Sequence, residues 1–294
     1  MSGPGRAGRG LASWWFAPAP LARVAWLRTV VYLFVPVDVL LTTPWVASHG
    51  DLAPSLYHPL LIGRLLPLPT PTHGVVLAVE AALLVSAVVA ATGRAPRVAG
   101  TAVLVLYLEW MVIAFSYGKV DHDRFAFLVA LAVLPTVGRA RHDDPAASDA
   151  AGWALRCVQV AVVATYFLSA WAKLRYGGPE WLNSATLVTA VIRKGTPLAM
   201  PLLHVPWVLR AVQWGIVAFE LSSPAVLVVR DARLRHAWVV GCYAFHVMTF
   251  ATISIVFLPH CVALLAFLPL ERAAAAARLP QRAAEPVGSP GIAT

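Results

Sequence analysis

The strongest candidate for chemistry in this sequence is a lysine at the end of an apolar segment. Tyr166, Ser169 and Lys173 lie three and four residues apart, so in a helix they share one face. Burial disfavours a charged ammonium group, and a neutral amine can act as a general base. Lys173 can equally extend its ammonium to the lipid headgroups, so the spacing alone leaves base and membrane anchor open.

A second group of ionisable residues lies between two apolar segments. Asp121, His122 and Asp123 stand between Lys119 and Arg124. Either neighbouring aspartate can hold the imidazole of His122 in one tautomer, which makes it a candidate catalytic residue. The alternative is a solvated loop. No HExxH motif and no paired His or Cys spacing occurs, so no metal is expected.

Glu109, Glu220 and His246 lie inside apolar segments, the two glutamates beside Trp110 and Phe219. A charge at the centre of a bilayer costs roughly 2.5–3.5 kcal/mol on insertion scales. Such residues therefore either pair with one another inside a helical bundle or line a cavity. We take these three residues as candidates for a cavity wall, with structural pairing as the alternative.

The composition determines what kind of protein holds these residues. Hydrophobic residues make up 59% of the 294 residues and charged ones 13%, and the mean hydropathy is +0.72. Soluble domains average about half apolar and a quarter charged. The sequence therefore predicts an all-α, polytopic transmembrane bundle. Its net charge of +9 comes from short groups of Arg between apolar runs, so no nucleic-acid partner is expected.

About eight segments are apolar enough to be helices across or within a bilayer. They are 24–41, 74–91, 98–117, 125–137, 153–173, 207–229, 237–252 and 255–270. Numbering the gaps alternately places at least two Arg residues in every gap on one side, which predicts that both termini are cytoplasmic in a cell-membrane protein. Two long gaps on the other side, 42–73 and 174–206, are apolar, and we expect them to be re-entrant or interfacial and to cover an extracytoplasmic cavity.

The segment YFLSAWAKLRYGGPEWL, from Tyr166 through Trp181 to residue 182, resembles a known family. It is similar to the HTTM (horizontally transferred transmembrane) domain of the vitamin K-dependent gamma-carboxylase superfamily. Three further matches follow the same order. They are the His122 turn, the segment from Glu220 to Pro224 leading to the sequence RDAR at 230–233, and His246 followed by two phenylalanines. The resemblance covers residues 20–272, which leaves an N-terminal tail, 1–22, a domain, 23–272, and a C-terminal tail, 273–294, expected to be disordered.

The resemblance implies an enzyme that uses a reduced, vitamin K-like quinone. In the carboxylases the lysine that Lys173 matches deprotonates the quinol, and a histidine that His122 matches assists. Tyr166, Ser169, Trp181, Glu109, Glu220 and His246 are then expected to bind the cofactor. The carboxylases pair their lysine with a second one, where this chain has Ala172, and carry a β-rich soluble part that binds their substrate. Without a counterpart to that part, we do not expect processive carboxylation of a protein.

Two functions therefore follow from the sequence. The first is a quinone- or lipid-dependent membrane enzyme with Lys173 as base and His122 assisting. The second is a non-enzymatic accessory protein for the maturation of, or immunity to, a secreted peptide. Membrane lipid and a secreted peptide or protein are the expected partners. A transporter would show inverted repeats, and the sequence has none.

Overall fold

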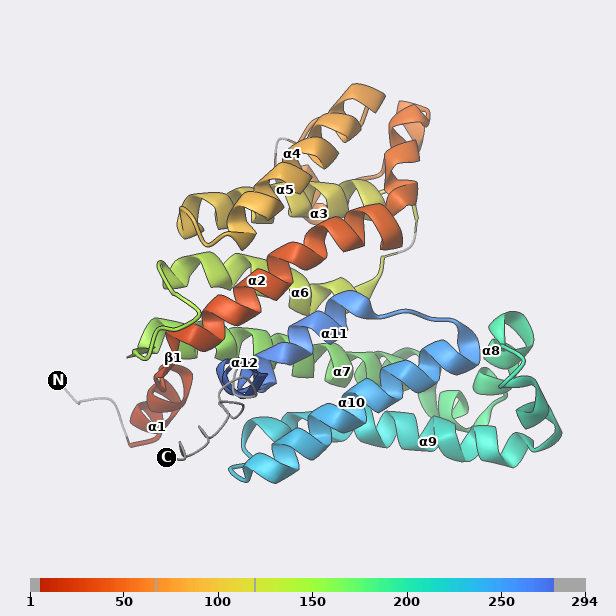
Figure 1. Ribbon diagram of the computed structural model, residues 1–294. Coiled ribbons are helices and arrows are strands. Elements are labelled where there is room, and N and C mark those ends of the chain that lie inside the picture. Colours follow the sequence, from red (N-terminus) through yellow and green to blue (C-terminus); the bar gives the residue numbers. More distant parts are fainter. Residues whose placement is uncertain (1–5, 67, 119, 278–294) are drawn as a thin grey trace, which may run out of the picture.

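The computed structural model describes residues 6–66, 68–118 and 120–277 (Figure 1). Helices account for 79% of the structure. In the described ranges the sheet is limited to one antiparallel pair, β1 (Ala19–Pro20) with β2 (Ala147–Ser148). The prediction of an all-α fold is confirmed.

The α-helices form one layered bundle with short 3-10 turns at several ends. The α-helices are α1 (Arg6–Trp15), α2 (Leu21–Val37), α3 (Leu61–Leu65), α4 (His73–Ala91), α5 (Pro96–Phe115), α6 (Phe125–Val133), α7 (Asp149–Asn183), α8 (Thr186–Lys194), α9 (Pro206–Ser222), α10 (Ala232–Ile253), α11 (Leu258–Leu264) and α12 (Leu270–Ala277). The 3-10 helices are η2 (Pro44–Asp51), η3 (Pro54–Leu56), η4 (His122–Arg124), η5 (Leu134–Val137), η6 (Met200–His204), η7 (Ser223–Leu227) and η8 (Leu265–Phe267), and η1 (Asp38–Thr42) is a π-helix.

Five helical segments are long and apolar enough to cross a membrane. They are Leu21–Thr42, His73–Ala91, Pro96–Phe115, Asp149–Asn183 and Ala232–Ile253. The remaining three predicted segments are also helical, as α6, α9 and α11 followed by short 3-10 turns, but none of them is among the candidate membrane spans. The length and the apolar composition of these helices indicate a membrane protein. The number of eight membrane crossings stays a prediction.

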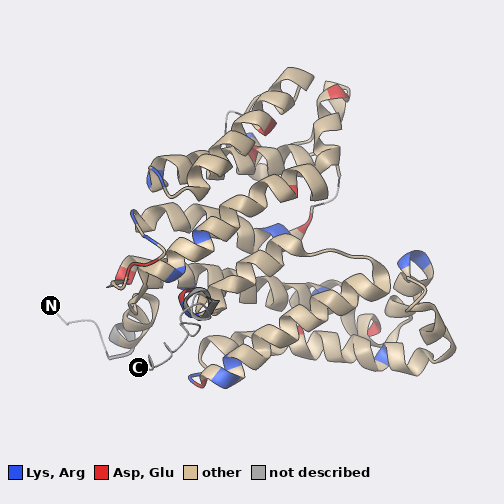
Figure 2. Cartoon of the chain, in the orientation of Figure 1, with Lys and Arg blue, Asp and Glu red and all other residues tan. Residues whose placement is uncertain are grey.

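The charged residues lie mostly at helix ends and connections, and the helices themselves are largely apolar (Figure 2). Helices α2, α4, α5 and α6 pack together and share a large apolar core. Helix α7 joins this core to the C-terminal helices, because α6 packs on one side of it and α9 on another (Figure 1). Two smaller apolar clusters lie among α7, α8, α9 and η6.

Helix α7 bends sharply near its C-terminal end. Gly178 has φ +61°, a left-handed conformation that glycine adopts without a Cβ clash, and Pro179 follows it. In a straight helix, Lys173 and Trp181 would be separated by a rise of about 12 Å. The bend instead brings the indole ring of Trp181 to 5.3 Å from the Lys173 Nζ atom.

Helix α10 ends because Ser254 has φ +55°, and its backbone N–H donates to the carbonyl of Phe250. Residues 254–257 form an irregular connection, and Pro259 lies in the first turn of α11, where its missing N–H is not needed. The last two predicted segments are therefore separate helices. Helix α11 turns back to pack on α6 and α7, so the connection crosses the C-terminal part of the bundle (Figure 1).

The C-terminal tail begins differently from the prediction of a disordered segment from residue 273. Helix α12 continues to Ala277 and packs on α2, where Glu271 forms an ion pair with Arg23 at 2.7 Å. Residues 278–294, and residues 1–5 of the predicted N-terminal tail, lie outside the described residues.

Candidate functional site

A cavity of about 440 Å³ lies among the C-terminal helices. Its walls come from α7, α8, α9 and the C-terminal half of α10, with η4 and α11 at one end. Most of the lining is aliphatic or aromatic, and the polar side chains gather on α7, α10 and η4. This volume lies in the range of small-molecule sites, and an apolar wall with a few convergent polar groups is typical of them.

The structure brings almost all of the predicted site residues to this one cavity. The residues that line it are Lys173, His122, Tyr166, Ser169, Trp181, Glu220 and His246. Lys173 and His122, which are far apart in the sequence, thus face the same space. Of the two long segments expected to cover it, only the one at 174–206 contributes lining residues, through Trp181, α8 and η6.

The expectation that Glu109 lines the cavity is wrong. Glu109 is buried on α5, and its charge acts on Tyr57 in the connection after η3, in the N-terminal half of the bundle. The segment 42–73 likewise packs on α4 and α5, away from the cavity. Both glutamates lie among apolar residues in the sequence, which therefore does not distinguish them. Only Glu220 reaches the cavity, because α9 packs on α7.

Lys173 and Glu220 form an ion pair in the cavity wall. The Nζ atom donates to Oε1 at 2.6 Å and to Oε2 at 2.5 Å, and also to the Ser169 hydroxyl at 3.0 Å. The Lys173 side chain is 21% exposed and that of Glu220 5%. The two side chains therefore form one charge-neutral, largely buried pair in the cavity wall.

A cluster of aromatic rings and histidines forms the inner end of the site. The Tyr166 hydroxyl lies 2.7 Å from Nε2 of His246, and the Tyr166 ring packs edge-on against His260 at 4.7 Å. Within the described residues, Nδ1 of His246 and both ring nitrogens of His260 have no hydrogen-bond partner. Buried polar groups without partners are costly, so this end of the cavity suits a ligand with polar atoms.

The His122 turn is fixed by an ion-pair network that sequence reasoning did not identify. Arg124 contacts Asp38 at 3.2 Å, Asp123 at 3.2 Å and Asp121 at 3.8 Å. Asp38 begins the π-helix η1 and also accepts a hydrogen bond from Tyr107 at 2.7 Å.

This network connects the N-terminal core to the cavity, because His122 and Asp123 both line it. The ring of His122 lies 6.3 Å from that of Phe257, between α10 and α11. Burial raises the pKa of Asp123 to about 6, against the opposing effect of the Arg124 charge. Asp123 therefore changes its charge near neutral pH, at the edge of the cavity. Lys119, at the start of the predicted polar group, lies outside the described residues.

Across residues 6–66, 68–118 and 120–277, no group of three or more His, Cys, Asp or Glu side chains could hold a metal ion. The three cysteines are unpaired thiols. The arrangement can instead supply proton transfer, through Lys173 with Glu220, and polar contacts, through Tyr166 and the histidines.

The fold and the site together define a helical membrane protein with an apolar cavity and an ion pair in its wall. A family model, the HTTM domain, matches residues 54–271. The match spans most of the chain, and the protein therefore belongs to the HTTM family, as its sequence motifs predict. No curated protein and no solved structure matches the chain significantly.

Proposed function

We propose that this HTTM protein binds a reduced quinone, or a lipid with a similar hydroxylated head, and removes a proton from its hydroxyl group. The observation that carries the proposal is the Lys173–Glu220 ion pair in the wall of an apolar cavity that His122 also lines. An isolated ion pair facing lipid would be expensive. One that faces an apolar cavity has a use in proton transfer.

The residues of the cavity fit such a molecule. An apolar tail or ring would be held by aliphatic side chains such as Val191 and Ile216 and by the rings of Trp181 and Phe245. The partnerless nitrogens of His260 would match the oxygens of a quinone ring. When bound, the reduced quinone would supply an acidic hydroxyl group and two electrons.

The roles of the chain's own residues follow from charge balance. The pair is neutral as a whole, so a proton taken from a hydroxyl goes to the Glu220 carboxylate, directly or through Lys173. The ammonium of Lys173 then remains beside the oxygen that has lost the proton and stabilises its charge. Ser169 holds the amine in place at 3.0 Å, and His122 assists from the end of the cavity that η4 and α11 form.

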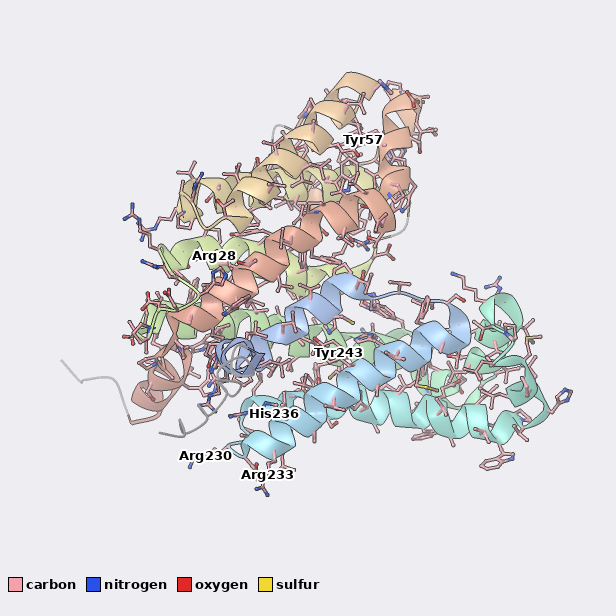
Figure 3. All side chains as sticks on the ribbon, viewed as in Figure 1. Arg28, Tyr57, Arg230, Arg233, His236 and Tyr243 are labelled. Carbon is pink, nitrogen blue, oxygen red and sulfur yellow. The ribbon has the colours of Figure 1, made fainter. Side chains whose placement is uncertain are left out.

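The proposed orientation places the cavity on the extracytoplasmic side of the cell membrane and both termini in the cytoplasm. The C-terminal half of α10 lines the cavity, whereas Arg230 and Arg233 lie at the N-terminal end of this helix (Figure 3). Basic residues favour the cytoplasmic side. The similarity to vitamin K-dependent carboxylases supports the same arrangement and suggests related chemistry, with a secreted peptide or protein as acceptor.

Turnover of a reduced quinone tests this proposal directly. Purified protein in lipid nanodiscs would be given reduced menaquinone, and its oxidation would be followed by absorbance alongside oxygen consumption. We expect Lys173→Ala to abolish turnover above background, whereas Lys194→Ala, which removes an exposed lysine at the end of α8, should leave it unchanged. Equal activity in Lys173→Ala and wild type would end the assignment of Lys173.

Native mass spectrometry of the same preparations separates enzyme from accessory protein. A quinone or lipid that co-purifies and is turned over supports the enzyme. A retained ligand without turnover, together with capture of an unmodified secreted peptide, would instead favour the accessory function.

A further inference from the structure

A second cavity lies at the other end of the bundle from the Lys173 site. It has a volume of about 120 Å³ and is lined by Arg23, Arg156, Arg235 and Gln159, together with small and apolar residues. We propose that this arginine pocket binds a phosphate group, carried either by a phospholipid head or by a small soluble compound. Its function is separate from that of the Lys173 cavity.

The arginine pocket holds more positive charge than its carboxylate neutralises. Arg23 forms two hydrogen bonds with Glu271, at 3.0 and 2.7 Å. Neither Arg156 nor Arg235 pairs with a carboxylate within the described ranges, and the charges of these two repel each other. All three arginines are only partly exposed. An anion between them would relieve this repulsion.

Helix ends add to the positive potential. Arg23 lies in the first turn of α2 and Arg235 at the start of α10, where the N-terminal ends of the helix dipoles are positive. Cations in these positions are unfavourable by themselves. The same ends favour a bound anion, and phosphate commonly binds where helix N-termini and arginines meet.

The guanidinium of Arg156 is fixed in position rather than free to extend into solvent. It lies 4.6 Å from the ring centroid of Trp14 and donates to Gln159 Oε1 at 2.9 Å. Gln159 is itself held, because its Nε2 donates to the carbonyl of Ala266 at 2.8 Å. A held guanidinium loses less conformational freedom when it binds an oxyanion.

The size of the pocket and its surroundings indicate the ligand class. The pocket is small, and three guanidinium groups around a space of about 120 Å³ suit a compact oxyanion such as a phosphate group. Exposed Arg230 and Arg233 extend from the same end of α10 (Figure 3). Such a rim would attract an anionic headgroup at a membrane surface.

Binding measurements with two probes test the proposal and distinguish the sources of phosphate. Delipidated full-length protein in a non-ionic detergent would be titrated calorimetrically with inorganic phosphate and, separately, with dioctanoyl phosphatidylglycerol, at constant ionic strength set with chloride. We expect the double variant Arg156→Gln/Arg235→Gln to weaken binding tenfold or more, as for lost hydrogen bonds between charged groups. The matched control Arg94→Gln, an exposed arginine in the connection between α4 and α5 and outside the pocket, should bind within twofold of wild type.

Binding of inorganic phosphate with the expected variant pattern assigns the pocket to soluble phosphate compounds. Binding of phosphatidylglycerol alone assigns it to a phospholipid head. The proposal fails if neither probe binds wild type, or if the double variant and the control lose affinity equally. If the double variant does not fold, the melting temperature of wild type is the test. It must be higher with one of the two probes than with chloride, and no rise with either probe overturns the proposal.

Discussion

The Lys173–Glu220 ion pair makes a prediction about stability that does not depend on the identity of the ligand. Removing one partner of a buried pair leaves the other charge uncompensated, at a cost of about 3–5 kcal/mol. In Lys173→Met the stranded group would be Glu220, which is 5% exposed and would keep only a 3.4 Å contact with Ser169. We therefore expect the full penalty in the free energy of unfolding.

The reverse substitution should cost less, because Lys173 has other ways to satisfy its charge. In Glu220→Gln the ammonium is 21% exposed, keeps its 3.0 Å hydrogen bond to Ser169, and lies 5.3 Å from the Trp181 ring. The expected loss is about 1.5–3 kcal/mol, the value for one hydrogen bond to a charged group. Replacing both residues, as Lys173→Met/Glu220→Gln, should cost less than the sum of the two single losses, because no charge is left unpaired.

These four proteins form a double-mutant cycle that can be measured by unfolding in mixed micelles, followed by circular dichroism. Lys194→Met, at an exposed site, serves as the control and should leave stability within about 0.5 kcal/mol of wild type. The reasoning is refuted if Glu220→Gln costs more than Lys173→Met. Additive losses in the double variant would also refute it, because they would mean that the two charges do not interact.

Three further substitutions test other parts of the structure. Asp123→Asn removes a carboxyl group whose pKa is raised by burial to about 6. The folded wild type binds the proton of this group more tightly than the unfolded chain does, so the stability of wild type falls as the pH rises from about 4 to 6. The variant should match wild type near pH 4 and exceed it by up to about 3 kcal/mol at pH 7.5, and a lower melting temperature at pH 7.5 would contradict this. Tyr166→Phe removes the 2.7 Å contact to His246 and should cost about 1–3 kcal/mol in the same unfolding assay, where no loss would show that the contact is not formed. Gly152→Ala would place a Cβ 1.9 Å from a backbone carbonyl oxygen and should lower the melting temperature, whereas Gly215→Ala, with open space around it, should raise it slightly or leave it unchanged.

The sequence predicted the parts of this protein that depend on local patterns. Apolar runs of about twenty residues gave the positions of the helices, and the spacing of Tyr166, Ser169 and Lys173 placed them on one face of α7. The order of the motifs predicted the HTTM family, which the family model confirms. These features need no knowledge of which helices touch, because each is set by neighbours along the chain.

Contacts between distant segments could not be predicted in the same way. Glu109 and Glu220 look alike in the sequence, yet only Glu220 reaches Lys173, because α9 packs on α7 whereas α5 packs on α4. The Asp38–Arg124 pair joins residues from different helices and has no sequence motif. The three arginines of the second cavity likewise come from α2, α7 and α10.

The sequence by itself thus determined the membrane environment, the helical segments and the family of this protein, because hydropathy and residue spacing act locally. Only the tertiary structure decided which charges meet and where space is left between the helices. The bend at Gly178 and the return of α11 across the bundle enclose the cavity that Lys173, His122 and His260 share. Those features depend on how side chains far apart in the chain fill space together, and no single segment encodes that.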